Sequence, residues 1–138
     1  MRYRILCAYD GSPSADRAFD FGARLAKRFE GELHVLTVVA PVEPPVQCEI
    51  DALLAASRER FASSFAQLER RDTALGVDLV FEVCVGYAAQ QVLHYAEQMD
   101  VHHIVTGRRG ISAMERWTMG SVSQKIVLHA TSVVTVVP

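Results

Sequence analysis

The sequence has 138 residues, of which 50% are hydrophobic and 22% are charged, so it is long enough to bury a core and too apolar for a disordered chain. The formal net charge is -2, without the basic excess or stripe that nucleic-acid-binding folds usually show, and no apolar run approaches the roughly 20 residues that span a bilayer. We therefore expect one domain, residues 1–138, with no nucleic-acid partner and no membrane segment.

The N-terminal region predicts a strand followed by a helix. Residues 2–9 form a strand-like run, and Ser12-Pro13 is typical of a helix start, because serine caps the first turn and proline suits its first position. The helix is expected to end at Gly31. Its expected stripe consists of four residues at helical spacing: Ala18, Phe21, Leu25 and Phe29.

The middle of the chain predicts strand, helix and strand. Residues 32–40 form a nearly apolar second strand, and the prolines after it indicate an exposed loop. Residues 49–75 show helical spacing and are closed by Gly76, and residues 77–85 form a third strand. The phenylalanines of the helix are expected to lie in the core: Phe61 and Phe65.

The last third completes an alternating order of strands and helices. Gly86 turns into a short helix, residues 101–106 form a fourth strand, and a glycine loop leads to a helix at 120–130 and a strand at 132–137. This order predicts an α/β fold with an open five-stranded parallel sheet and helices on both faces. Such sheets bind ligands beyond the carboxyl ends of their strands, where the strand order reverses.

The segment 106–123, TGRRGISAMERWTMGSVS, has features of a phosphate-binding loop. Glycine lets a phosphate approach main-chain N–H groups, and a following helix N-terminus adds unpaired donors. Gly107 and Gly110 would form one wall of this site, the start of the last helix would form the second, and two serine hydroxyls would add donors. The alternative is a turn followed by a serine-capped helix. The glycine count alone leaves these two interpretations level.

The spacing Gly107-x2-Gly110-x9-Gly120-Ser121 resembles the G-x2-G-x9-G-[S/T] nucleotide-binding motif of the universal stress protein family. The Asp10-Gly11-Ser12 turn, with the strand before it and the helix after it, resembles the start of the same family. This resemblance implies the strand order 3-2-1-4-5 of the adenine nucleotide alpha-hydrolase-like fold. It also implies ATP or a related adenine nucleotide as ligand, with or without Mg²⁺.

The resemblance also implies roles for individual residues. Asp10, Gly11 and Ser12 should belong to the site, with Asp10 near the ribose or a metal-bound phosphate, and Val38 should contact the adenine through its backbone. The phosphates should be surrounded by seven residues: Gly107, Arg109, Gly110, Gly120, Ser121, Val122 and Ser123. A homodimer through the last strand is implied as well. Thr131-Ser132 depart from the family, which commonly has a proline before that strand.

Three functions follow from these observations. The favoured one is a nucleotide-binding regulatory protein of stress adaptation, in which the nucleotide orders the glycine loop. A weak ATP hydrolase is a second, but the sequence offers no convincing base or second metal carboxylate beside Asp10, so no catalytic residue is expected. A dimeric interaction scaffold without a nucleotide role is the third.

The histidines and cysteines predict no further site. His102 and His103 are neighbours on a strand and point to opposite faces, so they cannot readily share a metal ion. The isolated histidines are expected at the surface or its boundary: His34, His94 and His129. The three cysteines, Cys7, Cys48 and Cys84, are widely spaced, which is typical of a protein in a reducing cytoplasm. Cys7 and Cys84 are expected to be small core residues. Residues 111–119, which include Trp117, form either a lid over the nucleotide or a packed turn.

Overall fold

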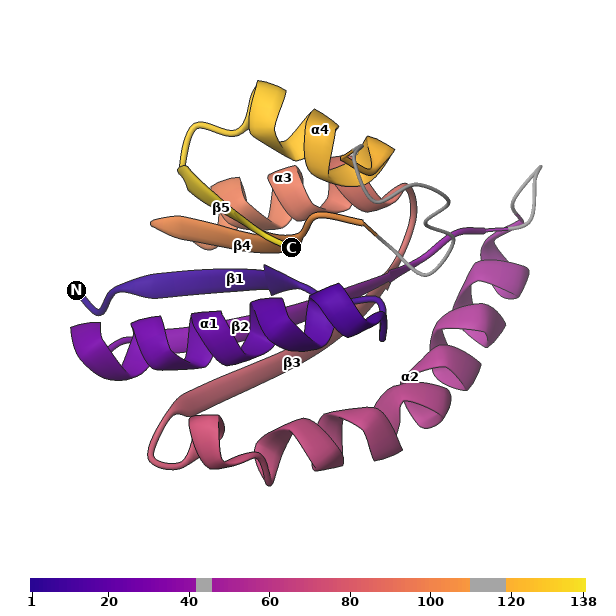
Figure 1. The fold of residues 1–138 in the computed structure, drawn as a ribbon. Helices are drawn as coiled ribbons and strands as arrows, with labels where there is room; N and C mark the ends of the chain where they lie inside the picture. The colour runs from indigo at the N-terminus through magenta and orange to yellow at the C-terminus, as the bar shows by residue number, and fades with distance from the viewer. Residues whose placement is uncertain (42–45, 110–118) are drawn as a thin grey trace.

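The computed structural model describes residues 1–41, 46–109 and 119–138 and shows one parallel sheet with helices on both faces (Figure 1). The strand order is β3-β2-β1-β4-β5, and every neighbouring pair is parallel. The predicted fold class and strand order are therefore confirmed. The strands are β1 (Arg4–Ala8), β2 (Glu32–Val39), β3 (Asp78–Val85), β4 (His103–Gly107) and β5 (Val133–Val137).

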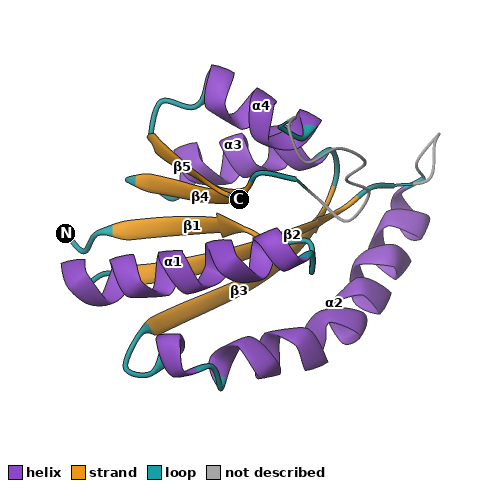
Figure 2. Cartoon of the chain, viewed as in Figure 1, coloured by secondary structure: helices purple, strands orange, loops and turns teal. Residues whose placement is uncertain are grey.

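The helices divide between the two faces of the sheet, with α1 and α2 on one and α3 and α4 on the other (Figure 2). Each face has its own apolar core, and the central strands β1, β2 and β4 contribute to both. None of the described helices is both long and apolar enough to cross a membrane. The helices are α1 (Pro13–Phe29), α2 (Gln47–Glu69), α3 (Ala88–Gln98) and α4 (Ser121–His129).

Helix α1 starts as predicted but buries a different face. The Ser12 hydroxyl accepts a hydrogen bond from the Ala15 N–H at 3.2 Å, and Pro13 is the first helical residue. Of the predicted stripe only Ala18 is fully buried, whereas Phe21 and Phe29 are exposed. The helix instead approaches the sheet mainly through small residues, which allow close packing, together with one large buried side chain, Phe19. The buried positions are Ser14, Ala15, Ala18, Phe19, Gly22, Ala23 and Ala26.

The segment predicted as one helix over 49–75 is divided. Helix α2 ends at Glu69, and a short 3-10 helix follows at Asp72–Ala74. The chain leaves the helix where Arg71 forms two hydrogen bonds with the Asp20 carboxylate of α1, at 2.8 and 2.6 Å. The prediction for the phenylalanines is confirmed, since Phe61 is buried and stacks on Phe65, which packs against the core beneath α1.

Candidate functional site

The two loops that the sequence singled out meet at the carboxyl ends of neighbouring strands. Strands β1 and β4 pair side by side, with Ala8 opposite Thr106, so the chain leaves both strands at the same edge of the sheet. A hydrogen bond joins the two segments directly, because the Ser14 hydroxyl donates to the Arg109 carbonyl at 2.5 Å. Residues from opposite ends of the chain therefore form one candidate site.

The first wall of this site is the turn after β1. Gly11 has a φ of +84°, which L-residues rarely adopt, and the Asp10 carboxylate accepts the Ser12 N–H at 2.9 Å. Asp10 is exposed and forms no ion pair within the described part of the chain, so its charge is available to a ligand. Ser12 is 2% exposed, and its hydroxyl caps α1.

The second wall begins where β4 ends. A Cβ on Gly107 would fall well inside contact distance of the Ser14 hydroxyl and lie 3.0 and 3.1 Å from the backbone atoms Ser14 C and Ala15 N. Gly107 is therefore required for the close packing of α1 on β4. Arg108 follows, and its N–H donates to the Val137 carbonyl of β5 at 2.6 Å. Gly110 and the possible lid at 111–118 lie outside the described residues.

The start of α4 completes the second wall. Gly120 caps the helix, and its N–H donates to the Arg108 carbonyl at 2.7 Å. Ser121 and Val122 are exposed at the first turn, where main-chain N–H groups have no partner within the helix. Ser123 differs from the expectation of a free hydroxyl donor, since it is 3% exposed and donates to the carbonyls of Arg108 and Gly120 at 2.9 and 3.1 Å. Its hydroxyl therefore joins the first turn of α4 to Arg108, which directly follows β4.

Val38 lies at the same edge of the sheet, near the end of β2. It pairs with Cys84 of β3 and packs against the core that α3 and α4 share. The neighbouring Thr37 is buried, and its hydroxyl donates to the Tyr9 carbonyl at 2.9 Å, which ties the end of β2 to the end of β1. The backbone of Val38 is thereby held at a fixed position relative to the Asp10 turn.

Two titratable side chains near the carboxyl end of β1, Cys7 and Tyr9, stay protonated at physiological pH. Burial, with smaller contributions from Asp10 and Asp16, raises the pKa of the Cys7 thiol well above its usual range. Burial and a 2.6 Å hydrogen bond to Asp16 likewise raise the pKa of Tyr9. Neither side chain therefore adds charge near the site, where the charged groups are Asp10 and the loop arginines.

The donor set fits an anionic ligand with an oxygen-bound cation. The positive end of α4 and the nearby glycine backbone suit a phosphate, because unpaired N–H groups and the helix dipole favour negative charge. No group of three His, Cys, Asp or Glu residues capable of holding a metal occurs in the described ranges. Mg²⁺ is commonly bound by one or two carboxylates together with substrate phosphates and water, so Asp10 alone would suit an ion that is also bound by a phosphate ligand.

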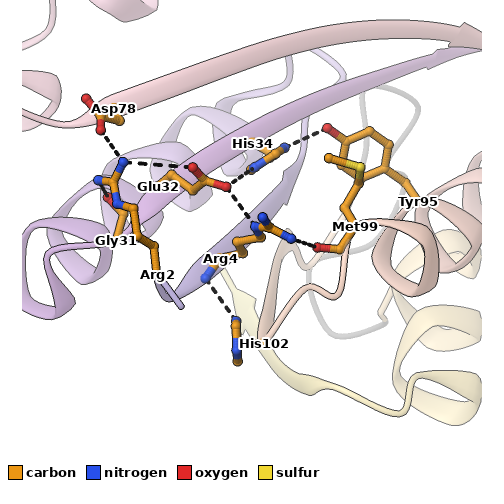
Figure 3. A network of polar contacts seen from close by, with 9 residues as sticks. All are labelled: Arg2, Arg4, Gly31, Glu32, His34, Asp78, Tyr95, Met99 and His102. Atoms are coloured by element: carbon orange, nitrogen blue, oxygen red, sulfur yellow. Dashed lines mark hydrogen bonds and ion pairs between the residues drawn. The ribbon is translucent and has the colours of Figure 1, made fainter.

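One set of polar contacts escaped prediction from the sequence, and it lies at the opposite end of the strands (Figure 3). His34 was expected near the surface, but it is 2% exposed and bonds Glu32 at 2.9 Å and the Tyr95 hydroxyl at 2.6 Å. Arg4 bonds the same Glu32 oxygen at 2.9 Å and the Met99 carbonyl at 2.6 Å. The expectation failed because β2 is covered on both faces, so either orientation of a side chain is buried.

The network lowers the pKa of one carboxyl group. The hydrogen bond from His34 is the largest cause of the lowered pKa of Glu32, opposed by burial and helped by Arg4. The two adjacent histidines of β4 have separate partners, since His102 accepts the Arg4 N–H at 3.0 Å and His103 contacts the Thr135 hydroxyl at 2.7 Å. This region joins strands to α3 and is remote from the loops.

These features define a doubly wound α/β protein with a candidate anion site at the carboxyl edge of its sheet. The model of the universal stress protein family matches residues 1–138. A universal stress protein of Bacillus subtilis is 26% identical over 144 aligned positions, which cover 97% of each chain. A putative universal stress protein of Staphylococcus aureus is 30% identical over 130 positions, covering 91% of this chain and 78% of that protein. The chain belongs to the universal stress protein family.

Solved structures share the fold. Universal stress protein UspA from Lactobacillus plantarum is 25% identical with a TM-score of 0.80, and the match covers 99% of this chain and 98% of that one. A universal stress protein in complex with cAMP is 20% identical with a TM-score of 0.77, covering 99% and 97%. One from Archaeoglobus fulgidus in complex with dAMP is 18% identical with a TM-score of 0.70, covering 100% and 98%.

Proposed function

We propose that this protein binds an adenine nucleotide, with ATP as its ligand, and acts as a regulatory protein rather than a dedicated enzyme. The observation that carries the proposal is the meeting of the Asp10 turn, the loop after β4 and the start of α4 at one edge of the sheet. The cAMP and dAMP complexes of two proteins with the same fold support an adenine nucleotide.

The described residues suggest how the ligand is held. The phosphates lie at the N-terminus of α4, where the N–H groups of Ser121 and Val122 have no partner within the helix and the helix dipole attracts an anion. Arg109 adds positive charge, and the backbone of Val38 contacts the adenine. Asp10 either accepts a ribose hydroxyl or holds a Mg²⁺ ion that is bound to the phosphates.

The same geometry supports a link between the site and a homodimer. Strand β5 is an edge strand whose one neighbour in the described sheet is β4, so its outer edge can pair with a second copy. The Arg108 N–H donates to the Val137 carbonyl at the end of β5. A ligand that repositions the Arg108 peptide therefore changes the end of the strand through which two copies pair.

Calorimetric titration of nucleotide-free protein with ATP tests the proposal. ATP and ADP should release or absorb heat with one site per chain, whereas GTP, which has the same phosphates and a different base, should bind more weakly. The fluorescence of Trp117, the only tryptophan, gives a second readout. If millimolar ATP produces no heat and no change in fluorescence, nucleotide binding is rejected. The dimeric scaffold then remains as the function.

Phosphate release separates a binding protein from a weak hydrolase. If the protein hydrolyses ATP through a Mg²⁺ ion held by Asp10, Asp10→Ala abolishes phosphate release while ATP binding persists. A regulatory binding protein instead shows phosphate release no faster than a control reaction without protein, in the wild type and in the variant alike.

A further inference from the structure

A loop that holds a phosphate has to keep its carbonyl groups away from the anion. Carbonyl oxygens carry partial negative charge, so a phosphate site needs main-chain N–H groups toward the ligand and carbonyl groups bonded elsewhere. Arg108 and Arg109 open the glycine loop, and their two consecutive carbonyl groups are the first that could face a phosphate. Where these two oxygens point is therefore decisive for the site.

Both oxygens are held by hydrogen bonds to other elements. The Arg108 carbonyl accepts from the Gly120 N–H at 2.7 Å and from the Ser123 hydroxyl at 2.9 Å, both at the start of α4. The Arg109 carbonyl accepts from the Ser14 hydroxyl at 2.5 Å. Ser14 belongs to α1, which begins directly after the Asp10 turn, and it is 8% exposed. A serine 95 positions away in the chain thus fixes the loop.

The space for this hydroxyl depends on the first glycine of the loop. A Cβ at position 107 would collide with the Ser14 hydroxyl, so Gly107 and Ser14 fit each other. The hydroxyl has no competing acceptor among its described hydrogen bonds, and the helix cap is supplied separately by Ser12. The bond from Ser14 is therefore dispensable for starting α1 and serves the loop.

We propose that Ser14 is a positioning residue of the nucleotide site, whose buried hydroxyl holds the Arg109 carbonyl away from the phosphates and fixes the loop to the Asp10 turn. This inference rests on the proposed function. Ser14 does not touch the ligand, so its effect depends on the phosphates of the ligand and not on the base or ribose. That dependence separates positioning of the loop from a general contribution to folding.

The test compares Ser14→Ala with Ser132→Ala as a matched control. The Ser132 hydroxyl also donates to a main-chain carbonyl, that of Val101 at 3.0 Å, but next to the start of β5 and away from the loops. Wild type and both variants are titrated calorimetrically with ATP and with adenosine, which lacks phosphates. Loss of one hydrogen bond predicts ATP binding weakened about tenfold in Ser14→Ala, with adenosine binding unchanged and Ser132→Ala like wild type.

A second variant and a spectroscopic readout make the outcome independent of folding. Ser14→Cys keeps a weak donor of similar shape and should bind ATP with intermediate affinity. In nucleotide-free protein, the carbonyl ¹³C resonance of Arg109 should move upfield in Ser14→Ala, because its hydrogen bond is lost.

Three results would overturn the inference in distinguishable ways. Unchanged ATP affinity in Ser14→Ala shows that the bond does not position the loop. Equal losses for ATP and adenosine assign Ser14 a structural role only. A wild-type chain that binds neither ligand overturns the proposed function itself and the inference with it, whereas the first two results leave nucleotide binding intact.

Discussion

Gly120→Ala should weaken nucleotide binding without weakening the fold. Gly120 has a φ of -65° and a ψ of 156°, which alanine adopts freely, and its added Cβ would lie 3.4 Å from Arg108 O and from Arg109 Cα, an ordinary contact. Alanine lowers the entropy of the unfolded chain, which stabilises by about 0.4–1 kcal/mol, and it is a poorer helix cap, which costs a similar amount of roughly 0.5–1 kcal/mol. The free energy of unfolding should therefore stay within about 1 kcal/mol of the wild type.

The effect of the same methyl group on the ligand is larger. It stands at the start of α4, where in the proposed binding mode the phosphates approach the main chain, and it would separate them from the nearest N–H groups. Loss of one hydrogen bond to a charged group removes about 1.5–3 kcal/mol, which is roughly a 10- to 100-fold weaker affinity for ATP. Calorimetry with ATP and thermal melting without it measure the two quantities separately.

Gly107→Ala is the matched variant with the opposite expectation. Its Cβ would collide with the Ser14 hydroxyl and press on backbone atoms at 3.0 and 3.1 Å, so overpacking should lower stability by about 1–3 kcal/mol and the melting temperature by several degrees. The reasoning is refuted if Gly120→Ala binds ATP like the wild type, or if Gly107→Ala melts at the wild-type temperature.

Three further expectations concern charge. Asp10→Asn keeps the acceptor for the Ser12 N–H but removes the charge, so Mg²⁺ should no longer strengthen ATP binding; an undiminished Mg²⁺ effect in calorimetry contradicts this role. The pKa of Glu32 is lowered in the folded state, so its stabilising effect is present above the ordinary pKa of 4.5 and is lost as pH falls through the folded-state pKa. As pH falls below 4.5, the free energy of unfolding measured with urea should therefore decrease less in Glu32→Gln than in the wild type. If the stability of the two proteins depends on pH in the same way, Glu32 is excluded as the source of the stability lost at low pH. Val133→Asp places like charges at the edge of β5, where Val133 is 59% exposed, and should shift a dimer toward monomer in sedimentation; a dimer of unchanged stability argues for another interface.

The fold followed from the sequence because its signals are local. Alternating strand and helix segments, with glycine and proline between them, determine a parallel sheet almost without reference to particular contacts. The face of α1 was mispredicted because helical spacing was counted on large apolar side chains, whereas most of the face that packs on the sheet consists of alanine, serine and glycine, with Phe19 as its one large side chain. Phe21 and Phe29 remain exposed for that reason.

The contacts that shape the candidate site were less accessible to the sequence. The motif predicted that Gly107, Gly120 and Asp10 meet at one edge of the sheet, yet the bond from Ser14 to Arg109 joins residues 95 positions apart and leaves no local pattern. The same holds for His34 and Tyr95, which are 61 positions apart. For Ser123 the sequence shows that a hydroxyl is present but not that it donates to the Arg108 and Gly120 carbonyls in the structure.

The pairing of β1 with β4 has a consequence for how the protein is made. Strand β1 comes from residues 4–8 and β4 from residues 103–107, so the central pairing of the sheet waits until most of the chain has left the ribosome. Contacts between such distant segments form slowly, since the intervening chain must be closed into a loop first. The candidate site lies across this junction, with one wall from each end of the chain. A nascent chain therefore gains the candidate site only at a late stage of its synthesis, and a ligand bound there would hold this junction closed.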